Sequence, residues 1–247
     1  MTSVLDSIRR LTGPVGDLGG RWMLDPEVLG PCRAAGYPNG FAYYMAGRGG
    51  VLGDVDAEVV TSAFGFFSPD VVRSMWEPGV AVEGARAAAA RYGGACATYG
   101  QRRLSGFDGA GRLAELAGAV AARADSAGLA LFAGWRVEPL PADDAARAFF
   151  LVHVLRELRG SVHVAAVLAA GLRPVEAVLA TAGVQGAERF GWKGPFPDIA
   201  PAAKEPAERL TDEIVARLYS EVLDETAVAS LADLVDAAKA HLDAAAG

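Results

Sequence analysis

Asp143–Ala170, DDAARAFFLVHVLRELRGSVHVAAVLAA, is the stretch that decides the fold. Its apolar residues recur at spacings of three and four, it holds no proline, and Gly160 is its one glycine; these features together predict a long helix. Asp143 stands where a helix start needs a side-chain acceptor for the free amides of the first turn. Polar side chains among so many large apolar ones will be partly buried, and each of them then needs a partner.

Helical periodicity also dominates the rest of the chain. Further segments rich in alanine, leucine and arginine are 81–104, 110–127, 174–190 and 211–246, and residues 1–13 are expected to form a short first helix. Glycine and proline predict breaks between helices at 36–40, 77–79, 105–106, 139–141 and 191–206. Short apolar runs such as 129–135 are the only strand candidates, and they are too few to build a sheet. We therefore predict an all-α fold of about ten helices.

Two parts of the chain resemble each other. Arg48-Gly49-Gly50-Val51 and Arg159-Gly160-Ser161-Val162 each follow a predicted helix, and each is followed by a second helix and by a third that begins with proline. One interpretation is an internally duplicated helical module with helix-turn-helix-like pieces, and the other is chance similarity in a chain rich in alanine and glycine. The duplication divides the chain into modules 1–105 and 106–200, with a single domain as the alternative. Residues 201–247 are expected to form amphipathic helices that pack on the body or pair with a second copy in a homodimer.

Composition excludes several classes of protein. The 247 residues are 52% hydrophobic and 21% charged, as in a globular protein with a sizeable core, and the net charge of −7 gives no electrostatic footprint for nucleic acid. No apolar run reaches the roughly 20 residues that a membrane span needs. Cys32 and Cys96 have the spacing of neither a zinc site nor a disulfide framework, and the first residues lack the pattern of a secretion signal. We expect a cytoplasmic protein without a membrane or nucleic-acid partner.

The long helix carries the most informative polar residues, which are His153, Arg156, Glu157, Arg159 and His163. One interpretation is an ion-pair network of Arg156 and Glu157 that ties helices together. A second makes Glu157 or His163 a general acid or base whose pKa is set by burial and by the neighbouring arginines. A third is a metal or haem site, because His153 and Glu157 are spaced i, i+4 and His163 could add a ligand.

Candidate ligand-binding residues lie in both halves of the chain. Arg48 stands in a glycine-rich turn that lacks the spacing and the preceding strand of a dinucleotide-binding loop. If the duplication is real, Arg48 and Arg159 occupy equivalent places and could point into one cleft that takes an anion. Aromatic residues at loop–helix junctions could form its apolar wall or pack in the core; they include Tyr43, Phe67, Trp135 and Trp192.

Five short segments of the sequence form a combination that is typical of one family. They are Gly47–Val55, Phe64–Pro69, Phe132–Arg136, Leu155–His163 and Phe190–Trp192. Together they resemble the actinobacterial SalK-like family, which is described as a helix-turn-helix family, and the resemblance runs from about residue 33 to residue 232. It implies a helix-turn-helix shape and no particular activity.

The best helix-turn-helix candidate is Val164–Gly183. A recognition helix presents side chains that bond base edges and phosphates. The second helix of the candidate, Pro174–Ala182, offers one glutamate and one threonine, with no Arg, Lys, Asn or Gln. It is apolar on nearly every side, which is typical of a buried helix and not of a DNA-reading one.

The leading hypothesis from the sequence is an all-α protein that binds a small organic molecule in an apolar pocket holding a few buried polar groups. No motif for covalent catalysis or for a cofactor is present, so an enzyme would perform acid–base chemistry such as elimination, isomerisation or cyclisation of a secondary metabolite. Glu157 and His163 would then move protons. The side chains expected to hold negative charge are Arg48, Arg156 and Arg159. The alternatives are a ligand-responsive helix-turn-helix transcriptional regulator, and a haem or metal protein that uses His153 or His163.

Overall fold

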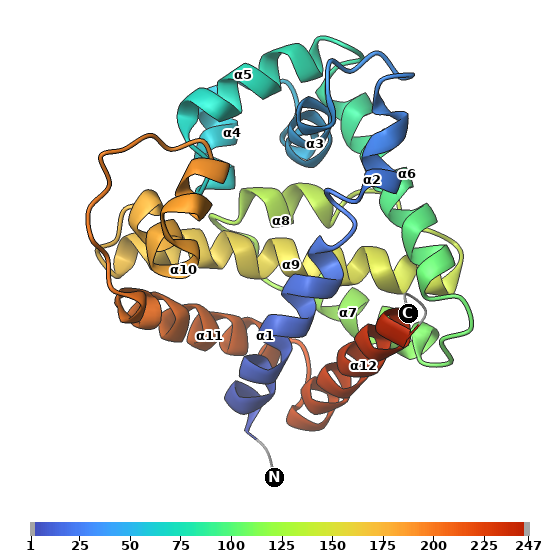
Figure 1. The fold of residues 1–247 in the computed structure, drawn as a ribbon. Helices are drawn as coiled ribbons and strands as arrows, with labels where there is room; N and C mark the ends of the chain where they lie inside the picture. Colours follow the sequence, from blue (N-terminus) through green and yellow to red (C-terminus); the bar gives the residue numbers. More distant parts are fainter. Residues whose placement is uncertain (1–2, 245–247) are drawn as a thin grey trace.

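A computed structural model describes residues 3–244, and this part of the chain is helical apart from its connecting loops (Figure 1). It contains twelve α-helices, three short 3-10 helices and, within residues 3–244, no strand, which confirms the all-α prediction. The first half holds α1 (Val4–Gly20), α2 (Pro26–Leu29), η1 (Gly30–Cys32), α3 (Gly40–Gly49), η2 (Gly50–Leu52), α4 (Ala57–Phe64), α5 (Pro69–Val80) and α6 (Ala85–Arg103). The second half holds α7 (Ala110–Arg123), α8 (Ala130–Trp135), α9 (Asp144–Ala169), α10 (Pro174–Arg189), η3 (Pro201–Lys204), α11 (Glu205–Ser220) and α12 (Glu225–Ala244).

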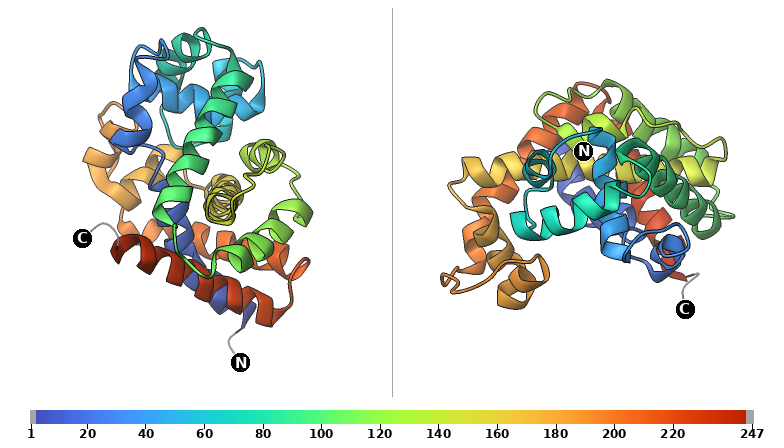
Figure 2. Two further views of the ribbon diagram at one scale, coloured as in Figure 1. Left: turned by 90° about the vertical axis from the view of Figure 1, so that its right-hand side faces the viewer. Right: turned by 90° about the horizontal axis from the view of Figure 1, so that it is seen from above.

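Helix α9 is the central element of the molecule. It contacts α1, α6, α7, α8 and α11, which surround it in the left-hand view of Figure 2. Asp143 starts the helix as expected, since its side chain accepts a hydrogen bond from the Ala146 amide at 2.9 Å. Every residue from 148 to 155 is buried. Burial of one Leu or Phe side chain stabilises a fold by roughly 1.5 to 3 kcal/mol, so this stretch is the core on which the other helices pack.

Some elements differ from the sequence-based expectation. Residues 77–79, predicted as a loop, lie inside α5, because Gly79 lets this helix approach α3: a Cβ atom at Gly79 would lie 2.6 Å from the Ala42 carbonyl oxygen. Residues 129–135 supply helix α8 and no strand. The amphipathic helices expected within residues 201–247 are present as α11 and α12, and the Asp224 side chain accepts the Ala227 amide at the start of the second. The predicted ends at residues 1 and 246 lie outside the described residues.

Helices α9 and α10 form a sharply bent pair. Residues 170–173 join them through Gly171, which has a φ of 81°, and the two axes are bent by 108°. Within residues 3–244 no single helix is long and apolar enough to cross a membrane, and only this bent pair meets the criteria of length and hydropathy jointly.

The two segments of the proposed duplication have different backbones. Helix α9 runs unbroken through Gly160, whereas α3 ends at Gly49 and continues as the 3-10 helix η2. One hydrophobic core includes residues from Ile8 to Leu242, and two smaller clusters include residues of α10. The duplication and its module boundaries remain predictions.

Candidate functional site

A cavity of about 300 Å³ lies where the end of α1, helix α3, the end of α4 and helix α9 meet. We call it the arginine cavity, after the two guanidinium groups in its wall. It is lined by Gly20, Met23, Leu24, Tyr44, Arg48, Ala63, Phe64, Phe66, Phe67, Arg156, Gly160, Val164 and Phe190. Its lining therefore combines two cations with four phenylalanine rings and holds no acidic side chain.

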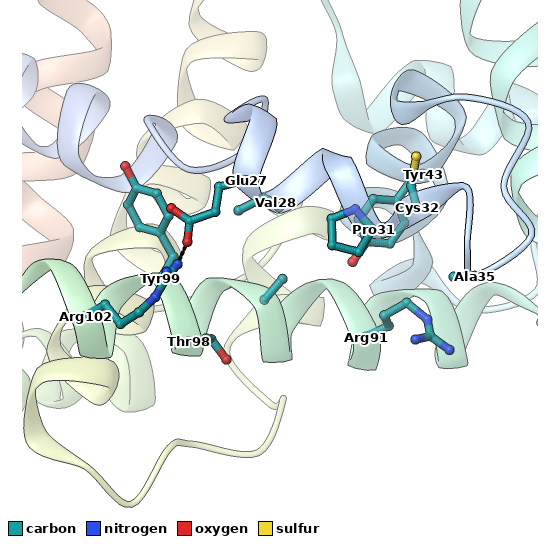
Figure 3. Close-up of a pocket in the computed structure, with 11 residues that line it drawn as sticks. Glu27, Val28, Pro31, Cys32, Ala35, Tyr43, Arg91, Thr98, Tyr99 and Arg102 are labelled. Atoms are coloured by element: carbon teal, nitrogen blue, oxygen red, sulfur yellow. Dashed lines mark ion pairs between the residues drawn. The ribbon is translucent and has the colours of Figure 1, made fainter.

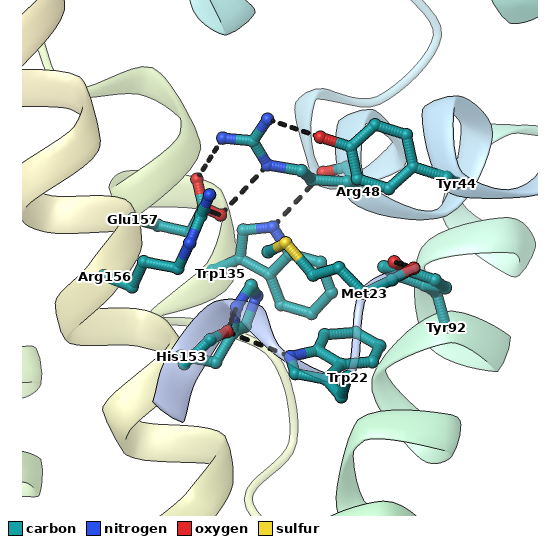
Figure 4. Close-up of polar contacts among 10 residues, drawn as sticks. Trp22, Met23, Tyr44, Arg48, Tyr92, Trp135, His153, Arg156 and Glu157 are labelled. Atoms are coloured by element: carbon teal, nitrogen blue, oxygen red, sulfur yellow. Dashed lines mark hydrogen bonds and ion pairs between the residues drawn. The ribbon is translucent and has the colours of Figure 1, made fainter. Parts of the chain in front are cut away.

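A buried ion pair underlies the cavity and joins α3 to α9 (Figure 4). The Arg48 guanidinium donates from Nε to Glu157 Oε1 at 3.0 Å and from Nη2 to Glu157 Oε2 at 2.9 Å. Arg156 donates from Nη1 to the same Oε1 at 2.8 Å. This is the ion-pair network expected from the sequence, with Arg48 added to it.

The Arg48 side chain is held on every side. Its Nη1 donates to the Tyr44 hydroxyl oxygen at 3.0 Å, and its guanidinium lies 4.4 Å from the centre of the Phe64 ring. The backbone of the same residue is fixed too, because the Trp135 indole donates to the Arg48 carbonyl oxygen at 3.2 Å. A planar guanidinium with paired donors and an aromatic neighbour has little freedom to reorient, so Arg48 is a preorganised cation.

The electrostatics of the site favour an ionised Glu157. Burial alone would raise the pKa of this carboxyl, but the charges and hydrogen bonds of Arg48 and Arg156 outweigh burial and lower its pKa to about 2. Two guanidiniums and one carboxylate leave a surplus of one positive charge (2 − 1 = 1) beside the cavity. Arg156 is the accessible member of the three, with 28% of its side chain exposed against 8% for Arg48 and 1% for Glu157.

His153 lies in the core beneath this network. Its Nδ1 is 3.2 Å from the Gly19 carbonyl oxygen, and because a carbonyl can only accept, Nδ1 carries the proton. Nε2 is then a bare lone pair, and it is buried without a partner in the described part of the chain. The ring stands edge-on between Trp22 and Trp135, and burial lowers the pKa of His153 to about 4. This histidine is therefore neutral at ordinary pH.

The other residues singled out in the sequence lie elsewhere. Arg159 donates to Glu208 at 2.7 Å and to the Thr12 hydroxyl at 3.3 Å, so it does not share a cleft with Arg48. Trp135 is fully buried and supports the cavity only through Arg48. Trp192 supports it from outside, since its indole donates to the Phe66 carbonyl oxygen at 2.8 Å. Of the four aromatic candidates, Phe67 alone lines the arginine cavity.

The three residues considered as metal ligands also have separate surroundings. His163 itself does not line the arginine cavity, and its Nδ1 lies 2.8 Å from the Thr211 hydroxyl. His153 contacts Gly19, and Glu157 is held by its arginines. Within residues 3–244 no group of three or more His, Cys, Asp or Glu side chains is placed to hold a metal ion.

Tyr43 lines a different and larger groove, of about 390 Å³, between α2, η1 and α6 (Figure 3). The charged side chains of this groove already have partners. Glu27 pairs with Arg102 and Arg103, and Arg91 pairs with Glu83 through Nε at 2.7 Å. With its charges neutralised in pairs, this groove has less to offer a charged ligand than the arginine cavity.

Sequence reasoning missed several wall residues. Tyr44 could have been found, because it precedes Arg48 by one helical turn and so shares its face of α3. Phe64 and Phe66 belong to a visibly aromatic segment, but their direction depends on the α4–α5 connection. Phe190 reaches the cavity from the far end of α10, a long-range contact that no local pattern reveals.

The bent pair α9–α10 has the angle and the short turn of a helix-turn-helix unit. Its second helix is covered, because Ala177, Val178, Leu179 and Ala180 are all buried. Val178 and Leu179 pack in a small core with residues that include Phe190 and Trp192. Residues 181–185 of the same helix are exposed, and none of them is basic.

A family model described as a helix-turn-helix family matches residues 8–195. No curated protein and no solved structure matches the chain. The matched range contains every residue that lines the arginine cavity, while α11 and α12 lie beyond it.

Proposed function

The chain belongs to the helix-turn-helix family, and from this premise we propose that it binds a small organic anion with an apolar body in the arginine cavity. The observation that carries the proposal is the surplus positive charge of Arg48, Arg156 and Glu157 in a cavity walled by phenylalanine. We also propose that the chain is related to the SalK-like proteins and that its ligand is a secondary metabolite.

The unused donors of Arg156 support an anionic ligand. A guanidinium has five N–H donors, and Arg156 directs one recorded hydrogen bond, from Nη1, to Glu157. The other donors and the partial exposure of this side chain leave it able to bind a carboxylate or phosphate oxygen. Arg48 would contribute mainly its charge, because its Nε, Nη1 and Nη2 all have partners.

The apolar wall supports a ligand with a hydrophobic body. Phe64, Phe67 and Phe190 lie within contact range of one another, with ring centres 6.1 Å apart for the first two and 4.6 Å apart for the last two. Each square ångström of apolar ligand surface that they cover contributes roughly 25 cal/mol. A carboxylate joined to an aromatic or aliphatic body matches this combination of charge and wall.

Binding is better supported than acid–base catalysis by Glu157. A group that transfers protons near neutral pH works best with a pKa near that pH, and the pKa of Glu157 is about 2. Its two oxygens already accept three hydrogen bonds from arginine. Glu157 is thus suited to holding the two cations in place.

Calorimetric titration with 3-phenylpropionate tests the proposal, with 3-phenylpropanol as the uncharged analogue. We expect saturable binding of the carboxylate, at least tenfold weaker binding of the alcohol, and a loss of about tenfold or more in Arg156→Gln, since a charge-assisted hydrogen bond contributes about 1.5 to 3 kcal/mol. Arg147→Gln is the matched control: it removes an arginine from the same helix, outside the cavity. Equal binding of acid and alcohol, or equal losses in the two variants, would contradict the proposal.

A ligand-responsive transcriptional regulator is the second candidate, favoured by the 108° bend between α9 and α10. Binding to DNA from upstream of its own gene should then weaken steeply as salt is raised. The burial of residues 177–180 and the absence of basic residues from 174–182 argue against direct base contacts by this part of α10. No binding to that DNA even at low salt would exclude this candidate.

A further inference from the structure

A second cavity lies beside the arginine cavity and has hydrogen-bond acceptors at its polar end. Its volume is about 210 Å³, and it opens between α9, α10 and α11. We call it the histidine cavity; its apolar wall includes Phe66, Val178 and Phe190, and its polar end is formed by His163 and Glu208. Phe66 and Phe190 also line the arginine cavity, so these two rings separate the two spaces.

The hydrogen bonds around Thr211 determine which nitrogen of His163 carries the proton. The Thr211 hydroxyl oxygen lies 2.7 Å from the Ala207 carbonyl oxygen, which can only accept, so the one hydroxyl proton is donated there. The same hydroxyl oxygen lies 2.8 Å from His163 Nδ1 and must accept from it. Neutral His163 is therefore protonated on Nδ1, and its Nε2 is a free acceptor.

Glu208 supplies a second acceptor next to this lone pair. Its Oε2 accepts from Arg159 at 2.7 Å, and its Oε1 lies 3.9 Å from His163 Nε2. Two acceptors cannot bond to each other, and among the described residues neither Oε1 nor Nε2 accepts a hydrogen bond. The separation leaves room for one donor atom that bonds both, at about 2.8 Å from each.

The charges that face His163 allow it to stay neutral. Burial lowers its pKa, and the charges of Arg159 on α9 and Lys204 on η3 lower it further. Glu208 and Asp212 on α11 raise the pKa but do not outweigh these effects. At pH 7 the imidazole is thus an acceptor, and protonation at lower pH would give it a proton on Nε2 that pairs with Glu208.

We propose that the histidine cavity binds a primary ammonium group attached to an apolar body. The ammonium donates one hydrogen bond to His163 Nε2 and one to Glu208 Oε1, and the body packs between Phe66, Val178 and Phe190. An ammonium has three donors and no acceptor, which matches the two acceptor atoms His163 Nε2 and Glu208 Oε1. This inference does not depend on the anion proposed for the arginine cavity.

The experiment is a titration with 2-phenylethylamine, followed through the imidazole ¹⁵N signals of protein labelled at histidine. The chain has three histidines, so the signals can be assigned by substitution. We expect the amine, added up to about 10 mM, to shift the His163 Nε2 signal saturably and to leave His241 unchanged. 2-Phenylethanol, its uncharged analogue, should bind at least tenfold more weakly. Because protonated His163 no longer accepts, affinity for the amine should fall between pH 7 and pH 5.

Variants separate recognition of the ammonium from general effects on the fold. Glu208→Gln should weaken amine binding at least tenfold, while Glu205→Gln, which makes the same change at an exposed position of α11, should not. If Glu208→Gln fails to fold, Thr181→Trp replaces it, since this exposed residue lines the cavity and a large ring there would block it. Arg147→Gln, which changes a residue of α9 outside both cavities, should leave amine binding unchanged.

The proposal is overturned if the amine produces no saturable shift at His163. It is equally overturned if the alcohol binds as tightly as the amine, or if affinity rises as the pH is lowered, because either result would mean that the site recognises something other than a cation.

Discussion

His153 makes stability depend on pH at the scale of a single residue. Burial lowers its pKa to about 4 in the folded protein, against 6.5 for an ordinary histidine. Above pH 6.5 His153 is neutral in both the folded and the unfolded chain, and its stabilising contribution is fully present. As the pH falls from 6.5 towards 4, the free energy of unfolding decreases by about 1.4 kcal/mol for each pH unit, roughly 3 kcal/mol in all. We expect the free energy of unfolding, measured with urea at several pH values, to depend less steeply on pH in His153→Phe than in the wild type over this range. A variant at the exposed side of the fold, His241→Gln, is the control, and equal slopes for wild type and His153→Phe would contradict the assignment.

Glu157 is predicted to matter for stability more than any exposed acid. Glu157→Gln leaves the buried Arg48 without its counter-charge, and breaking a buried pair in this way costs about 3 to 5 kcal/mol. The exposed Glu188→Gln should cost less than about 0.5 kcal/mol. The double variant Arg48→Met, Glu157→Met should recover part of the loss, since apolar replacement of both partners removes the unpaired charge. Chemical unfolding measures all three, and a loss below 1 kcal/mol for Glu157→Gln would show that the pair is not the rigid base of the cavity.

At the scale of the element, two glycines should respond to alanine in opposite directions. Gly171 turns the chain between α9 and α10 with a φ of 81°, where a Cβ atom is strained, so Gly171→Ala should destabilise by about 1 kcal/mol or more. Gly94 lies within α6 with nothing within 4 Å of an added Cβ, so Gly94→Ala should stabilise by about 0.5 to 1 kcal/mol. The change in thermal midpoint should thus have opposite signs, and a shift in the same direction would contradict this account of the turn.

The elements were predictable where periodicity and caps agree. Asp143 and the apolar run behind it identify α9 to within a residue at each end. The local signals mislead where tertiary contacts override them: Pro78-Gly79 resembles a turn, yet it lies in a helix because Gly79 packs on α3. The C-terminal amphipathic helices are present as α11 and α12, although no glycine or proline marks the connection between them at 221–224.

The candidate site was predictable only in part. Local spacing places Arg156 and Glu157 together on a largely buried helix. That Glu157 meets Arg48 depends on how α3 docks on α9, and that Arg159 turns away depends on Glu208 of α11. Each of these contacts joins residues far apart in the sequence, and a single sequence carries no direct signal for them.

At the scale of the whole molecule, the packing around α9 creates two neighbouring cavities that share Phe66 and Phe190. Both rings also belong to the small core that covers α10, because Val178 and Leu179 pack against them. A ligand that moves either ring would therefore act on the helix-turn-helix pair.

The central claim is that the arginine cavity binds an organic anion, and a crystal structure of the protein with 3-phenylpropionate tests it most directly. The account predicts the carboxylate within hydrogen-bond distance, about 2.7 to 2.9 Å, of the Arg156 guanidinium and the phenyl ring among Phe64, Phe67 and Phe190. A carboxylate bound away from Arg156, or an arginine cavity that stays without the ligand at saturating concentration, would contradict it.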